Sequence, residues 1–249
     1  MSGHSKWSTI KRKKGKADAA RGRLFTKLIR EITVAARSGG GDPEANPRLR
    51  TAVTLAKSNN MPGDNIDRAI RKGTGEEPGV HYDEFSYEAF GPKGVGILIQ
   101  VLTDNKNRTA SEVRHILTRH GAHMGEPGSA ARLFEEKGLI TVEKGKVEEE
   151  ALLAVVLEAG AEDMKEEDET FEITTAPENL EAVREALEKT GIEYAEAELA
   201  RVPQMTVLLE GDEARRILRI VESLEENDDV QKVFANFDIP DSVMEEIAG

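Results

Sequence analysis

The chain has 249 residues, more than the roughly 100 to 200 of an ordinary domain, so we expect two or three compact units. It has no cysteine, which excludes disulfides, thiolate metal sites and cysteine nucleophiles, and it has neither a signal-peptide core nor an apolar run of about 18 residues. The net charge of −13 is uneven, because residues 1–75 carry 17 Lys and Arg against 6 Asp and Glu, whereas the remaining residues carry 17 against 41. We therefore expect a cytoplasmic protein without a membrane partner, whose N-terminal part at +11 binds a polyanion that the rest, at −24, repels.

The first segment, residues 1–21, is polar and strongly basic. Its clustered cations are Lys6, Lys11, Arg12, Lys13, Lys14 and Lys16. Such a cluster neutralises several phosphates and releases their counterions, which favours nucleic acid as the partner. Trp7, the only tryptophan, lies among these charges without apolar neighbours, as is typical of an exposed indole that stacks on an unpaired base. The alternative is a solvated tail with Trp7 folded back onto the helical domain.

Three amphipathic helices with short connections are expected next, and they predict a small helical domain. The first carries an apolar stripe over residues 25–36 and ends at the glycines that follow. Asn46 and Pro47 predict the N-cap and the first residue of the second helix. The third should run over residues 64–72 and stop at Gly73.

The cations of these helices extend the expected nucleic-acid footprint. They are Arg23, Lys27, Arg30, Arg48, Arg50, Lys57, Arg68, Arg71 and Lys72. Of these we assign Arg23, Lys27, Arg30 and Arg48 to the site. Helix surfaces normally carry charge, so an ordinary solvated role is an equal alternative for any one of them.

After a linker rich in Gly, Glu and Pro at 73–79, the pattern changes to strands alternating with helices. Strands are expected at 82–90, 95–102, near 133, and at 139–142, 170–175, 192–201, 205–209 and 230–237. Helices are expected at 109–120, 148–160, 178–190 and 212–226. The acidic run 162–169 is interpreted as a solvated loop. The pattern predicts an α+β fold in which the N-terminal three-helix domain is followed by two small α/β, ferredoxin-like sandwich domains.

The expected domain boundaries follow from the number of strands in each part of the chain. Residues 1–79 form the basic arm and the helical domain. Residues 80–137 have too few strands for a sheet of their own, so we expect residues 204–249 to complete them. Residues 138–203 are then an inserted α/β domain.

The polar turn at 104–109 is a second candidate contact with nucleic acid. Lys106, Asn107 and Arg108 would contact the backbone or a base there, aided by the positive end of the following helix dipole. Asn and Asp are equally expected in such a turn for capping alone, and Thr109 with Glu112 has the spacing of a capping box. Both interpretations stay open.

Other candidate sites are weak. His115, His120 and His123 lack the spacing of a helical zinc pair, and no Cys assists them. The glycines at 91–96 separate two strands, where a nucleotide-binding loop needs a strand followed by a helix. No nucleophile has a base and an orienting partner. We therefore expect no enzymatic activity, no cofactor, no metal and no small-molecule substrate.

One further pattern runs through nearly the whole chain. It begins with Gly3, His4, Ser5, Lys6 and Trp7 and continues through 25–31, 46–50, 60–70, 87–95, 104–109 and 228–233 with Asn236. This pattern resembles the YebC family of bacterial regulatory proteins, also called the YebC/PmpR family. The sequence departs from the family's usual pattern around 121–134, where Ala122, His123 and Met124 replace the common residues.

The resemblance implies three domains, one helical and two α/β, and a role in gene expression. For the family that role is DNA-binding transcriptional regulation or, for some members, translation on the ribosome; a mitochondrial relative is a translational activator of cytochrome c oxidase. Two hypotheses therefore remain. A transcriptional regulator binds duplex DNA, whereas a ribosome-associated translation factor binds structured RNA, including ribosomal RNA.

Overall fold

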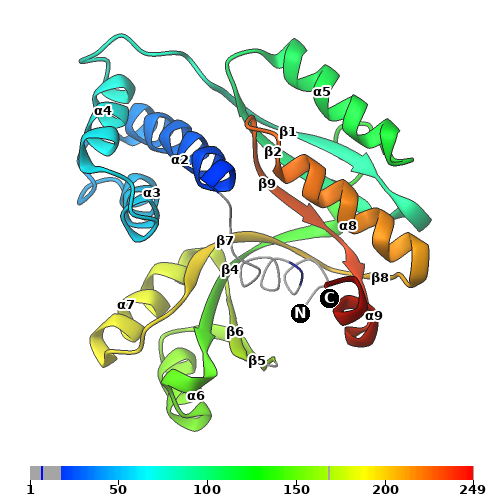
Figure 1. Ribbon diagram of the computed structural model, residues 1–249. Helices are drawn as coiled ribbons and strands as arrows, with labels where there is room; N and C mark the ends of the chain where they lie inside the picture. The colour runs from blue at the N-terminus through cyan, green and yellow to red at the C-terminus, as the bar shows by residue number, and fades with distance from the viewer. Residues whose placement is uncertain (1–6, 8–17, 168, 249) are drawn as a thin grey trace.

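A computed structural model describes residues 7, 18–167 and 169–248 of the chain (Figure 1). The helical part comes first, as α2 (Asp18–Gly39), α3 (Pro47–Ser58) and α4 (Gly63–Thr74). Two four-stranded antiparallel sheets with helices follow. The predicted α+β fold, with a helical domain ahead of the α/β domains, is confirmed.

Asn46 joins α2 to α3 as well as capping α3. Its Oδ1 accepts from the backbone N–H of Leu49 at 3.1 Å, and Pro47 occupies the first helical position, as predicted. Its Nδ2 donates to the carbonyls of Ala35 at 2.8 Å and Gly40 at 2.9 Å. One buried amide thus caps the start of α3 and bonds carbonyls near the end of α2.

Gly73 does not end the third helix, so that part of the prediction is wrong. The helix continues to Thr74, and the left-handed residue after it is Gly75, at φ 85°. Gly73 is instead the point where α4 touches α2. A Cβ at this position would lie 2.5 Å from the carbonyl oxygen of Thr33 and 2.7 Å from Cβ of Ala36.

The first sheet has the strand order β3-β1-β2-β9. Its strands are β1 (Asp83–Phe90), β2 (Gly96–Thr103), β3 (His123–Met124) and β9 (Val230–Ala235). The predicted hairpin is confirmed, with Phe90 opposite Gly96 across the turn. Helices α5 (Lys106–Arg119) and α8 (Gly211–Glu225) cover one face of this sheet, side by side (Figure 1). The main hydrophobic core lies between that face and the two helices.

Short elements near the C-terminus complete this core. The parallel pair β8 (Val207–Leu208) and β10 (Phe237–Asp238) flanks it, and the C-terminal helix α9 (Asp241–Ala248) follows. The helix α9 was not predicted. It contributes the fully buried Met244 to the core.

The second sheet has the order β5-β6-β4-β7 and carries its own core. Its strands are β4 (Phe134–Glu143), β5 (Ala161–Glu166), β6 (Thr170–Thr175) and β7 (Glu196–Pro203), and its helices are α6 (Glu149–Glu158) and α7 (Leu180–Thr190). The expected loop in the acidic run is wrong, since β5 pairs with β6 through Met164 opposite Ile173. An edge strand with one neighbour exposes most of its side chains and can carry many charges. The acidic composition of β5 therefore looks like that of a loop.

The two sheets pack together on the side of β2 that faces away from α5 and α8. Leu98 points away from α5 and α8 and packs in a small cluster with Phe134 of β4, Ala200 of β7 and Phe234 of β9. On the same side, α2 and α3 lean over the sheet and leave a groove of about 320 Å³. The first sheet thus takes strands from 83–124 and 230–235, while the second takes its strands from 134–203; the domain boundaries themselves stay a prediction.

Replacing Gly73 with Ala should destabilise the protein by about 1 to 3 kcal/mol, because the added methyl group meets backbone that cannot move aside. Thermal unfolding followed by circular dichroism measures the loss. Gly63→Ala is the matched control in the first turn of the same helix, since a Cβ there meets nothing within 4 Å. Equal stability of the two variants would contradict the close approach of α2 and α4.

Candidate nucleic-acid interface

The basic cluster of the N-terminal segment lies outside the described residues. This applies to Lys6, Lys11, Arg12, Lys13, Lys14 and Lys16. Trp7 is described, and it contradicts the expectation of an exposed indole. Its side chain is 8% exposed and belongs to the main hydrophobic core.

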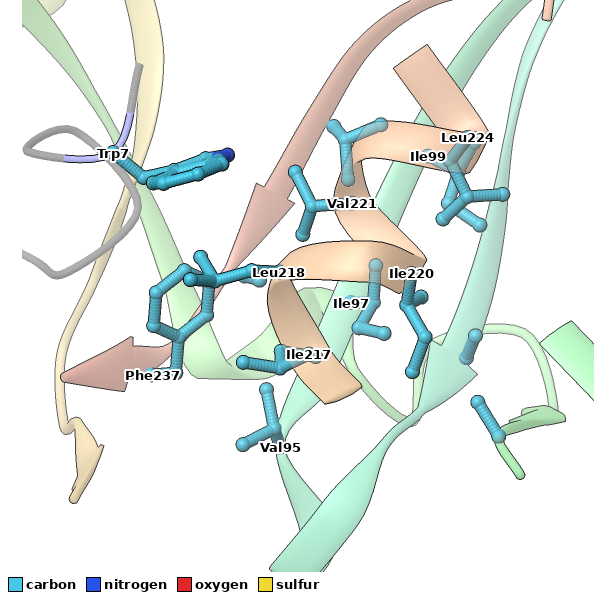
Figure 2. Packing of buried hydrophobic residues seen from close by; sticks show 14 of the residues in the cluster. Trp7, Val95, Ile97, Ile99, Ile217, Leu218, Ile220, Val221, Leu224 and Phe237 are labelled. Carbon is cyan, nitrogen blue, oxygen red and sulfur yellow. The ribbon is translucent and has the colours of Figure 1, made fainter. Parts of the chain in front are cut away.

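Trp7 packs against the α/β unit rather than the helical domain. Figure 2 shows the indole beside Leu218 and Val221 of α8 and Phe237 of β10. Among the described residues, no acceptor is within hydrogen-bond distance of its Nε1. The apolar neighbours come from more than 200 residues away, so the local sequence gave no sign of them. Trp7 is therefore a packing residue that ties the start of the chain to the α/β core.

The basic side of α2 faces the turn between α8 and β9. Arg23 lies 3.6 Å from Glu226, and the ammonium of Lys27 donates to the carbonyl of Glu225 at 2.5 Å. Arg30 reaches further in, where its guanidinium is 13% exposed. Three cations predicted to contact nucleic acid thus hold α2 against the end of α8 and the turn that follows it.

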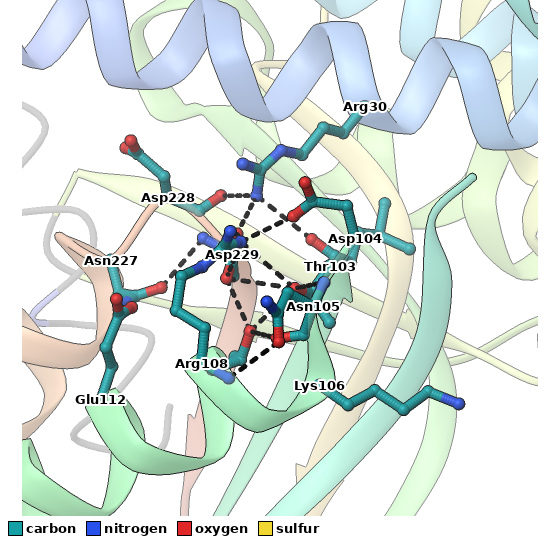
Figure 3. A network of polar contacts seen from close by, with 12 residues as sticks. Arg30, Thr103, Asp104, Asn105, Lys106, Arg108, Glu112, Asn227, Asp228 and Asp229 are labelled. Carbon is teal, nitrogen blue, oxygen red and sulfur yellow. Dashed lines mark hydrogen bonds and ion pairs between the residues drawn. The ribbon is translucent and has the colours of Figure 1, made fainter. Parts of the chain in front are cut away.

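Arg30 ends on the carboxylate of Asp229, which is 3% exposed (Figure 3). One guanidinium nitrogen of Arg30 donates to Asp229 Oδ1 at 2.6 Å, to the Asp228 carbonyl at 2.6 Å and to the Leu102 carbonyl at 3.2 Å. The guanidinium also lies 5.5 Å from the centroid of the Tyr82 ring. Arg30 is therefore engaged inside the molecule, and the prediction that it contacts a phosphate has these partners to compete with.

Asp229 collects donors from the turn at 104–109 as well. Arg108 donates to Oδ2 at 2.7 Å and to Oδ1 at 3.0 Å, and the hydroxyls of Thr103 and Thr109 donate to Oδ2 at 3.1 and 2.6 Å. Burial alone would raise the pKa of Asp229, but the hydrogen bonds from Thr109, Arg108 and Arg30 outweigh it and lower the pKa. The carboxylate is charged and joins α2, β2, α5 and β9.

The helix α5 starts three residues earlier than expected. Its N-cap is Asn105, whose Oδ1 accepts from the backbone N–H of Arg108 at 3.0 Å. The predicted capping box of Thr109 and Glu112 is therefore wrong, because Thr109 is buried and bonded to Asp229 while Glu112 accepts from Asn227. Capping, which was the alternative interpretation of this turn, does occur.

The remaining predicted site cations also have acidic neighbours. Arg48 donates to Glu31 at 2.6 Å and to Glu84 at 2.9 Å, joining α3 to α2 and β1. The hydrogen bond to Glu31 raises the pKa of Arg48 despite burial, and Glu84 adds to the effect. Lys106 lies 3.2 Å from Asp83 and stacks over the ring of Phe85, 5.6 Å from its centroid.

Four other cations of the helical part take no part in these contacts, although Arg68 and Lys72 are close enough to Glu77 to help lower its pKa. In the ranges that the structure describes, no ion pair or hydrogen bond engages the side chains of Arg21, Lys57, Arg68 and Lys72. Arg68 and Lys72 are one turn apart on α4. Sequence reasoning included Lys57, Arg68 and Lys72 among nine helical cations but had no means of telling free ones from paired ones. It missed Asp229 altogether, because the partners of this residue lie 120 to 199 positions away.

This arrangement defines the class of protein: a basic three-helix unit docked by ion pairs on an α+β body that carries two antiparallel sheets. Comparison with known proteins gives the family. The model for the "TACO1/YebC protein N-terminal domain" matches residues 5–76, and that for the "TACO1/YebC second and third domain" matches residues 82–237. The chain belongs to the TACO1/YebC family, which confirms the resemblance seen in the sequence.

Relatives match over their full length. A protein of Pelotomaculum thermopropionicum is 58% identical over 97% of this chain and 100% of its own, and one of Syntrophus aciditrophicus is 53% identical over 100% of both. Each is named "Probable transcriptional regulatory protein". The crystal structure of a conserved hypothetical protein from Aquifex aeolicus, 49% identical, superposes with a TM-score of 0.84 over 91% of this chain and 93% of that one. Within the described part of this chain, the helices lack the length and apolarity needed to cross a membrane.

Because Trp7 is the only tryptophan, its fluorescence reports on one site. We expect a blue-shifted emission that acrylamide quenches poorly, and a red shift on unfolding. Trp7→Ala should cost about 3 to 5 kcal/mol of stability, and Trp7→Phe less, since the ring refills most of the space. A red-shifted, easily quenched emission from the folded protein would contradict the burial of the indole.

Asp229→Asn should lower stability at pH 7 by up to about 3 kcal/mol, because two guanidinium groups lose their shared buried charge. The folded-state pKa of Asp229 is below its unfolded value, so the stabilisation is complete above the unfolded pKa and disappears as the pH falls through the folded one. The stability difference between wild type and variant, measured by urea unfolding, should therefore shrink below about pH 4.

Asp104→Asn is the control for this charge, since Asp104 also pairs with Arg108, at 2.7 Å, but is 39% exposed. It should cost less than about 1 kcal/mol. A loss that is equal for the two variants, or one that does not depend on pH for Asp229→Asn, would show that Asp229 does not act through its charge.

Proposed function

We propose that the chain is a nucleic-acid-binding regulator of gene expression that holds duplex DNA through its N-terminal basic region. One observation carries the proposal: after internal pairing, the helical part still has free cations, while the rest of the chain is strongly acidic. The proposed footprint consists of Lys6, Lys11, Arg12, Lys13, Lys14 and Lys16 of the first segment with Arg21, Lys57, Arg68 and Lys72 of the helices.

Residues in intramolecular contacts are left out of this footprint. Arg23, Lys27, Arg30, Arg48, Lys106 and Arg108 already face carboxylates or carbonyls. Moving any of them to a phosphate would leave an acidic partner behind near a polyanion, which opposes binding. The binding region is therefore smaller than the charge count of the sequence indicates.

Duplex DNA is preferred to unpaired RNA for two reasons. The indole of Trp7, which was the sequence argument for stacking on an unpaired base, is buried. Lys and Arg on helices contact phosphates without needing an unpaired base. The names of the relatives, probable transcriptional regulatory proteins, agree with this choice. The alternative, a ribosome-associated translation factor, remains an outcome of the test.

The test uses the full chain and a labelled 30-base-pair duplex titrated at several salt concentrations. Lys13→Ala with Lys14→Ala, and separately Arg68→Ala with Lys72→Ala, should each reduce the slope of log affinity against log salt by roughly 1 to 2, since ~0.9 accompanies each lost phosphate contact. Trp7→Phe should leave the slope unchanged.

Lys165→Ala with Lys189→Ala is the control for net charge, because both lysines are 58% or more exposed and lie in the second sheet unit. If this pair lowers the slope as much, the effect is not local and the N-terminal assignment is wrong. Sucrose-gradient fractionation of a lysate tests the alternative: a regulator of transcription stays in the light fractions, whereas migration with ribosomes, together with tighter binding of a structured RNA than of the duplex, would replace DNA with RNA as the target.

A further inference from the structure

The outer face of α5 and α8 carries a second group of arginines. The two helices lie side by side on the first sheet, with Leu117 and Ile217 turned inward and fully buried. Arg119, near the end of α5, and Arg216 and Arg219, in the middle of α8, are exposed on the outside. This face belongs to the acidic part of the chain, where sequence reasoning expects no affinity for nucleic acid.

Contacts between the helices bring these arginines to one place. A Cβ built on Gly121, just after α5, would lie 3.7 Å from a terminal nitrogen of Arg216. His120 extends across to α8, where its Nε2 is 3.3 Å from Oγ of Ser223, one turn beyond Arg219. The C-terminal end of α5 and the middle of α8 therefore form a single surface.

The three guanidinium groups are free where the others are paired. Within residues 18–167 and 169–248, no ion pair or hydrogen bond engages the side chains of Arg119, Arg216 and Arg219. Three nearby carboxylates are occupied elsewhere: Glu112 accepts from Asn227, Glu213 pairs with Lys93, and Glu226, just after α8, pairs with Arg23. Asp212 and Glu222 lie one turn from Arg216 and Arg219 on α8, but no ion pair joins them to these arginines in the part of the chain that the structure describes.

The charge of these arginines affects the pKa of His120, which lies beside them. Its pKa is lowered first by its partial burial and then by the positive charges of Arg119 and Arg219. The imidazole is therefore neutral at pH 7, and it would regain a higher pKa if an anion were to neutralise the arginines.

We infer that the α5–α8 face, formed by Arg119, Arg216 and Arg219 around His120, is a second contact surface for the phosphate backbone of a nucleic acid. The inference rests on the proposed function. Free guanidinium groups bind phosphates through paired N–H donors, and Arg216 and Arg219 present theirs one turn apart on one side of a helix. An unpaired positive surface on a body of −24 net charge has a polyanion as its natural complement.

The experiment again uses the full chain and the 30-base-pair duplex. Arg216→Ala with Arg219→Ala should lower the salt slope by roughly 1 to 2, in addition to the loss from Lys13→Ala with Lys14→Ala, at ~0.9 for each lost contact. Arg216→Lys with Arg219→Lys should keep most of the slope, because the charges remain. In NMR titrations of the wild type, saturation with duplex should raise the pKa of His120.

The outcomes separate this inference from the proposed function. If the wild-type protein does not bind with a salt-dependent slope, the proposed function fails first. If it binds and depends on Lys13 and Lys14, but the Arg216 and Arg219 pair behaves like the Lys165 and Lys189 control, only the second surface is wrong. An unchanged pKa of His120 on saturation also overturns it, as does displacement of the duplex by poly-glutamate that depends on Arg216 and Arg219, which would indicate an acidic protein as the partner.

Discussion

The carboxylate of Asp229 fixes how the parts of this molecule sit on one another. It takes hydrogen bonds from Arg30 of α2, Arg108 and Thr109 of α5, and Thr103 at the end of β2. A charged carboxylate that is 3% exposed costs several kcal/mol unless its lone pairs are satisfied, and here every one has a donor. Because the donors come from three elements, the network has its full strength only when the helical unit, the hairpin and β9 are in one arrangement.

The unequal distribution of charge along the chain therefore has two consequences. Part of the +11 of the N-terminal region is used inside the molecule, where Arg23, Arg30 and Arg48 meet carboxylates of the acidic remainder. Fewer cations are therefore left to meet a polyanion. The positive charge of the N-terminal region therefore attracts the acidic remainder of the chain as well as a polyanion.

Structural features could be predicted from the sequence where the residues that determine them lie within a few positions of one another. The cap at Asn46, the hairpin from 83 to 103 and the stripe of the first helix are local patterns, and each is present. Features could not be predicted where the contact that determines them joins residues far apart in the sequence. Trp7 looks exposed beside its lysines, yet its apolar neighbours are Leu218 and Phe237. The close approach at Gly73 and the donors to Asp229 belong to the same class, since each needs the folded geometry.

The kinds of side chain on the two basic surfaces limit what they can recognise. The proposed contacts are cationic side chains, lysines and arginines in the N-terminal region and arginines on α5 and α8, and the one tryptophan that would read an unpaired base is in the core. Contacts of this kind position a nucleic acid but carry little base information. Two surfaces held at a fixed separation by the Asp229 network would instead select for the shape and bendability of the duplex, since only a duplex that follows both surfaces gains the full set of phosphate contacts. Selectivity would then depend on the rigidity of the docking between the helical unit and the first sheet, to which the buried Asp229 carboxylate contributes through Arg30 and Arg108.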